Sequence, residues 1–125
     1  MRTNFRLHDG VRICHLDFSH IPTEEAALAA IAEAKKVIAG EPHQSVYTIT
    51  NVTGSRVTNT LRNALNDLTQ HNKPYVRFGA VVGATAIQRV ILRAIIQITG
   101  RRLFAAESMA EAVAVVVKEA KGARG

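Results

Sequence analysis

The chain has 125 residues, the length of one ordinary domain, and its 47% apolar content excludes global disorder. Its net charge of +6 arises in the second half, because residues 1–50 hold five Lys/Arg against six Asp/Glu and residues 51–125 hold eleven against four. The single cysteine, Cys14, excludes an internal disulfide and a cysteine metal cluster. We expect one domain over residues 1–125, with Cys14 as a small buried hydrophobe.

The N-terminal residues MRTNFRLHDG lack the apolar core of a signal peptide, and no apolar run is long and uncharged enough to span a bilayer. We therefore expect an unprocessed, soluble protein of the cytoplasm. Asp9-Gly10 lies between two apolar runs and predicts a β-hairpin, because glycine accepts the positive φ of a tight turn.

Strands and helices are then predicted to alternate. Thr23 is a helix cap, and the first helix should end at Gly40. The later elements are expected to be a strand at 46–50, a helix at about 59–71, a strand at 75–82, a helix at about 86–99, a strand at 101–106, a helix beginning after Ser108, and a frayed tail at 121–125.

The helix expected at 86–99 has more apolar residues than one face needs. Leu92 and Ile96 are left off its main stripe, and we interpret them as extra core coverage or a small contact patch. The stripe predicted to face inward consists of Ile87, Val90, Ile91, Ala94, Ile95 and Ile98.

Alternation of five strands with four helices predicts an α/β domain with a mixed, mostly parallel sheet. Right-handed crossovers place the loops after the third and fourth strands at one sheet edge. Residues 53–55 (Thr-Gly-Ser) should therefore lie beside residues 83–85 (Gly-Ala-Thr).

These two loops carry the polar groups that suggest a binding surface. Thr58 precedes a helix whose N-terminus offers unpaired amides to an anion. A phosphate on Thr58 or Thr60 would lie near Arg56 and Arg62, although the simpler interpretation is that Thr58 only caps the helix. The loop at 83–85 lacks the glycine spacing of a nucleotide-binding loop.

The segments ICHLDFS, TITNVTGSRV, KPYV, VVGATAIQRVILRAI and TGRRLFAAES follow one another along the chain, and Ala110-Glu111-Ala112 lies in the last helix. In the order and spacing of these segments the chain resembles the STAS domains, named for sulphate transporters and anti-sigma-factor antagonists. The resemblance is strongest to their SpoIIAA-like branch of small bacterial proteins, which shares features with the Sec14 lipid-binding lobe.

This resemblance implies a non-enzymatic domain that binds partner proteins or nucleotides and, in some members, is switched by serine phosphorylation. Matched by position, the family's loop falls on residues 51–54 and its phospho-acceptor region on residues 58–60. Asn51 stands where an aspartate is usual, and the Asp-Ser-Ser-Gly signature is missing. Both departures argue against a simple phosphoswitch.

Other chemistry receives less support. The five histidines show no ligand spacing and are interpreted as surface or strand-edge residues, so we predict no metal and no cofactor. No nucleophile motif appears, and the basic second half lacks the aromatic pattern of a nucleic-acid binder, so nucleic acid ranks last among the partners. A solvated face is the simpler interpretation of that charge.

The sequence thus predicts a single STAS-like regulatory or protein-interaction domain, anti-sigma-factor-antagonist-like, that is not an enzyme. The alternative is a carrier for a small apolar, lipid-like or anionic ligand held between sheet and helix. The residues expected to contact the protein partner or ligand are Asn51, Thr53, Gly54, Ser55, Arg56, Thr58, Gly83, Thr85 and Arg89.

Overall fold

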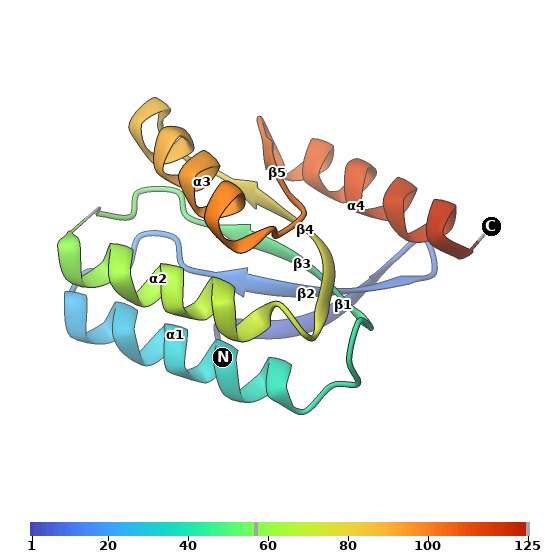
Figure 1. Ribbon diagram of the computed structural model, residues 1–125, viewed down its shortest axis with the longest axis horizontal. Helices are drawn as coiled ribbons and strands as arrows, with labels where there is room; N and C mark the ends of the chain where they lie inside the picture. Colours follow the sequence, from blue (N-terminus) through green and yellow to red (C-terminus); the bar gives the residue numbers. More distant parts are fainter. Residues whose placement is uncertain (57, 125) are drawn as a thin grey trace.

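The computed structural model describes residues 1–56 and 58–124 and contains the predicted alternation of strands and helices (Figure 1). The elements are β1 (Thr3–His8), β2 (Val11–Asp17), α1 (Glu24–Ala39), β3 (Val46–Asn51), α2 (Asn59–Asn72), β4 (Val76–Val82), α3 (Ala86–Thr99), β5 (Leu103–Ala106) and α4 (Met109–Arg124).

The predicted hairpin is confirmed. Asp9 and Gly10 both have positive φ, 51° and 78°, and β1 pairs antiparallel with β2 from Thr3 opposite Leu16 to His8 opposite Val11. Two successive positive φ angles match the twist of the flanking strands.

The sheet has the strand order β1-β2-β3-β4-β5. It is mixed, because β1 is antiparallel to β2 whereas the β2–β3, β3–β4 and β4–β5 pairs are parallel. An α/β fold with a five-stranded mixed sheet and four helices is thereby confirmed. Since each parallel strand lies beside the next one in the chain, the right-handed crossovers put α1, α2 and α3 on one face. The last helix, α4, covers the other face (Figure 1).

Two apolar cores lie on the two faces of the sheet, because side chains alternate along each strand. One contains Cys14, Leu16 and Phe18 packed against α1 and α2. The other contains Ile13, Ile49 and their neighbours packed against α4. Burial raises the pKa of the Cys14 thiol to about 12, so this thiol is protonated and unreactive at neutral pH.

The C-terminal helix is longer than predicted. α4 continues to Arg124 where a frayed tail was expected from residue 121, and residue 125 lies outside the described residues. Ala120 is buried against the sheet, and Lys121 pairs with Asp9 of the hairpin turn at 2.5 Å. These contacts hold the last turns of the helix in place.

His15 differs from the prediction that the histidines are surface or strand-edge residues. It lies buried in the central part of β2, with its Nε2 2.9 Å from Nε2 of His8. Burial, helped by the charges of Arg6 and His8, lowers the pKa of His15 from 6.5 to about 4.

This depressed pKa predicts a pH-dependent stability. Between pH 6.5 and about pH 4 the unfolded chain binds a proton at this histidine and the folded chain does not, so stability falls as pH drops through that window. His15→Gln should flatten this dependence, whereas His43→Gln, at an exposed histidine, should leave it unchanged. Urea unfolding at several pH values measures it, and equal slopes in both variants would contradict the assignment to His15.

The orientation of α3 also differs from prediction. Four residues of its predicted inward stripe are exposed. Ile87 is 73% exposed, Val90 63% and Ile98 74%, and Ala94 is exposed as well. The face toward the molecule instead carries Ile91, Leu92, Ile95 and Ile96, all partly buried. Thr99 is the buried residue of this helix. α3 therefore carries apolar residues on both sides and packs only partly against the rest of the protein.

Candidate functional site

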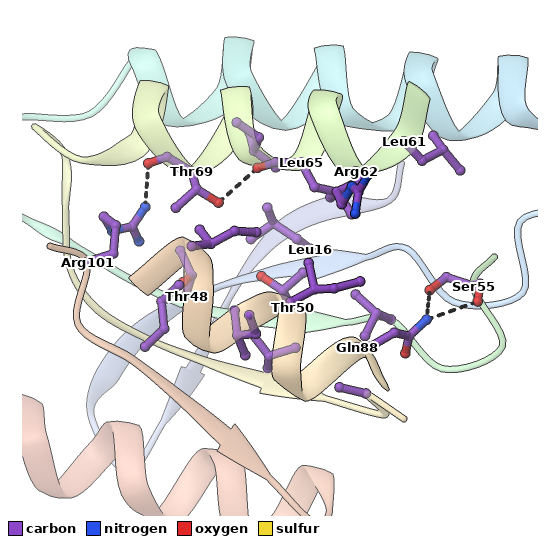
Figure 2. Close-up of a pocket in the computed structure, with 18 of the residues that line it drawn as sticks. Leu16, Thr48, Thr50, Ser55, Leu61, Arg62, Leu65, Thr69, Gln88 and Arg101 are labelled. Atoms are coloured by element: carbon purple, nitrogen blue, oxygen red, sulfur yellow. Dashed lines mark hydrogen bonds between the residues drawn. The ribbon is translucent and has the colours of Figure 1, made fainter. Parts of the chain in front are cut away.

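An apolar cavity of about 130 Å³ lies between α2, α3 and the sheet (Figure 2). The sheet forms its floor with Leu16, Thr48, Thr50, Val81 and Leu103. The walls are Leu61, Leu65 and Leu68 from α2 and Ile91, Leu92 and Ile95 from α3. The cavity is partly open to solvent.

Part of the cavity floor is formed by short side chains. Along β3, Thr48 and Thr50 face the cavity, whereas Ile49 between them packs under α4. On β4, Gly79 comes so close to Thr48 that a Cβ added there would lie 2.3 Å from the Thr48 Oγ1. The two threonines below and the partial packing of α3 above together leave the space unfilled.

Arg101 lies at the edge of this cavity between α3 and β5 (Figure 2), and the residue is only 6% exposed. Its Nη1 donates a hydrogen bond of 2.8 Å to the backbone oxygen of Thr69. Burial lowers the pKa of Arg101 to about 10, which leaves the guanidinium charged at neutral pH. Within residues 1–56 and 58–124 no carboxylate forms an ion pair with it.

Gln88 lies at another edge and joins the two predicted loops. Its Nε2 donates to the backbone oxygen and to Oγ of Ser55, at 3.2 and 3.3 Å (Figure 2). Its Oε1 accepts from the backbone amide of Thr85 in a capping box. The backbone amide of Val52 also donates to the oxygen of Val82 at 2.8 Å. The predicted adjacency of the loops is thus confirmed.

The first loop is held by its own hydrogen bonds. Asn51 Oδ1 accepts from the backbone amide and the hydroxyl of Thr53, at 3.0 and 2.7 Å. Gly54 has φ of 70°, and a Cβ there would lie 2.4 Å from Nδ1 of His20, so that ring covers the glycine. Gly83 in the second loop has φ of 86° and is in similarly close contact with Thr53.

Other predicted residues occupy different environments. Thr58 caps α2 by accepting from the Leu61 amide, and its hydroxyl donates to Glu24 Oε2 at 3.1 Å. Thr60 is exposed in the first turn of α2. Arg89 pairs with Glu107 at 3.1 Å and does not line the cavity. Arg56 is exposed and lines the loop side of the cavity.

A second cavity of about 200 Å³ lies between the first turns of α1 and α2. It includes Phe18, Ile21, Thr23 and Glu24, and shares Val52, Ser55, Arg56, Leu61 and Leu65 with the first cavity. The start of α2 therefore separates two adjoining hollows that meet at the first loop.

Sequence reasoning missed the cavity residues Thr48, Thr50, Gln88 and Arg101. The Thr-Ile-Thr alternation of β3 was the available signal, because it places two polar, small residues on one face of a central strand. The capping pair Thr85 and Gln88 was likewise readable from its spacing. The burial of Arg101 had no local signal.

No protein-family model matches the chain, and no curated protein matches it. Among the residues that the structure describes, no three His, Cys, Asp or Glu side chains gather where they could hold a metal ion. None of the helices in the described part has the length and apolar character needed to cross a membrane.

Proposed function

We propose that this protein binds a small, largely apolar molecule in the cavity between α2, α3 and the sheet. The observation that carries the proposal is a partly open cavity with leucine and isoleucine walls under a helix whose only buried residue is Thr99. Its volume of about 130 Å³ compares with the apolar cavity of about 150 Å³ that holds benzene in another protein.

α3 supplies one wall of the proposed site. The helix is bounded by Gly83 and Gly100, both at positive φ, and its apolar residues are distributed between the cavity and the solvent. In the part of the chain that the structure describes, no residue of α3 belongs to the cores under α1 and α4. The alternative carrier function predicted from the sequence is the one supported by these contacts.

Hexanol, a neutral probe of suitable size, tests this function. We expect it to shift the methyl NMR signals of Leu65 and Ile95, which line the cavity, and not those of Ile38 in the core under α1. Thr50→Leu fills part of the cavity and should weaken binding about tenfold or more, because the probe then competes with a side chain for the same space.

Thr60→Leu is the matched control, since it makes the same substitution at an exposed position outside the cavity. It should bind hexanol as the parent protein does. Unchanged Leu65 and Ile95 signals at saturating hexanol would remove the basis of the proposal.

A second candidate is the STAS-like regulatory function, in which the chain belongs to that family and binds a protein. The exposed apolar face of α3, with Ile87, Val90 and Ile98 beside the exposed Arg93, favours it. Charge complementarity selects an acidic surface with an apolar centre as the partner. Affinity purification should recover an acidic protein from the parent but not from Ile98→Ser, and equal recovery would contradict this interface.

A further inference from the structure

Arg101 carries a charge beside a cavity that is otherwise mostly apolar. The guanidinium has five N–H donors. Among the described residues its side chain donates one hydrogen bond, from Nη1 to the backbone oxygen of Thr69. Thr69 lies in the last turns of α2, so this carbonyl belongs to the negative end of the helix dipole and offsets part of the charge. Most of the hydrogen-bonding capacity of Arg101 remains for another acceptor.

The ion pairs of the fold do not use this arginine. Arg2, Arg12, Arg89 and Arg102 each pair with a carboxylate, and all of these pairs lie toward the surface. Arg101, in contrast, is only 6% exposed, and no carboxylate in the described part of the chain forms an ion pair with it. A buried charge without a counter-ion is destabilising, so an anion that reached it would be bound strongly.

Asn72 adds a second polar group to the same region. It lies three residues beyond Thr69 on α2, is buried, and lines the cavity. Its Oδ1 lies 3.0 Å from Nδ1 of His71, which leaves its side-chain amide nitrogen without a partner in the described residues. Arg101 and Asn72 therefore offer several N–H donors beside leucine and isoleucine walls.

We propose that Arg101 binds the carboxylate of a small monocarboxylic acid whose hydrocarbon part fills the cavity between α2 and α3. This inference rests on the proposed function of that cavity. The planar guanidinium matches a carboxylate in two parallel hydrogen bonds. By comparison with the cavity of about 150 Å³ that holds benzene, the space suits a hydrocarbon part of about six carbons.

Hexanoate and hexanol, which differ in the charged group, test the inference by titration calorimetry. The parent should bind hexanoate at least about tenfold more tightly than hexanol, because only hexanoate pairs with the buried charge. Arg101→Met keeps the length of the side chain and removes the charge. This variant should lose that preference and bind hexanoate no more tightly than it binds hexanol. Arg101→Lys should retain part of the preference, since it keeps the charge without the planar fork.

A measurement on the parent alone guards against a variant that fails to fold. Hexanoate labelled with carbon-13 at its carboxyl group should titrate at a lower pH when bound than when free, because the guanidinium stabilises the carboxylate. Equal titration of bound and free hexanoate, or equal affinity of the parent for the two probes, overturns the role of Arg101. Binding of hexanol without hexanoate overturns this inference alone, whereas binding of neither probe overturns the proposed function too.

Discussion

Ile38→Ala should lower the free energy of unfolding by about 2–5 kcal/mol, whereas Ile98→Ala should change it by less than about 0.5 kcal/mol. Both isoleucines lie in helices on the same face of the sheet. Ile38 is completely buried in the core under α1, and Ile98 is 74% exposed on α3. Truncating the first leaves a cavity in packed surroundings, while truncating the second removes a side chain already in water.

Urea unfolding of the two variants measures this difference directly. The comparison is a test of how α3 is rotated, because the sequence pattern placed Ile98 on the inward stripe of that helix. Comparable destabilisation by the two substitutions would show that Ile98 packs inward and that the wall of the cavity is formed by another face of α3.

Gly83→Ala should destabilise the fold by about 2–5 kcal/mol, because two costs add there. The residue has φ of 86°, a conformation that costs an alanine about 1–2 kcal/mol. The added Cβ would also lie 2.0 Å from Oγ1 and 2.7 Å from the backbone amide nitrogen of Thr53, and overpacking of this kind costs about 1–3 kcal/mol. The backbone of one loop would have to move away from the other.

Gly10→Ala provides the matched control for this variant. Gly10 has φ of 78°, yet no atom lies within 4 Å of a Cβ built there. It should show the conformational cost alone, so the difference between the two variants reports the contact between the loops. Unfolding free energies that agree within about 0.5 kcal/mol would mean that the loops separate easily and that their contact does not shape the cavity.

The elements of the fold were largely predictable because their boundaries depend on local chemistry. Asp9-Gly10 specifies the hairpin turn, Thr58 and Thr85 cap the helices that follow them, and Gly100 ends α3 in the left-handed conformation. Each of these signals acts within a few residues of the chain. The adjacency of the two loops also followed, since crossover handedness does not depend on particular side chains.

The face of α3 could not be obtained in the same way. Arg89 and Arg93 lie on one polar face of the helix, so the helical period favours the opposite stripe, which contains Ile87 and Ile98. The structure instead turns the neighbouring face, with Ile95, toward α2 and the sheet. The face that is covered depends on how the whole helix packs against those elements, and the pattern within the helix does not record it.

Of the residues predicted to contact a partner or ligand, Ser55 and Arg56 line the cavity. The two loops were placed correctly, but Arg89 pairs with Glu107 and lies outside the cavity, whereas Arg101 lines it. Two arginines that look alike in the sequence thus receive different environments, because burial depends on what the rest of the chain packs around them. The cavity itself is a gap between three elements, and a gap has no residue pattern of its own.

The position of α4 has a consequence for the order in which the protein can be completed during synthesis. Among the described residues, α4 is the helix that covers the sheet face containing Ile13, Ile49 and Phe78, and it follows the other elements of the fold in the chain. Until it leaves the ribosome, that face presents a continuous apolar surface to the cell. The nascent chain is therefore open to chaperones and to association with other unfinished chains until α4 docks.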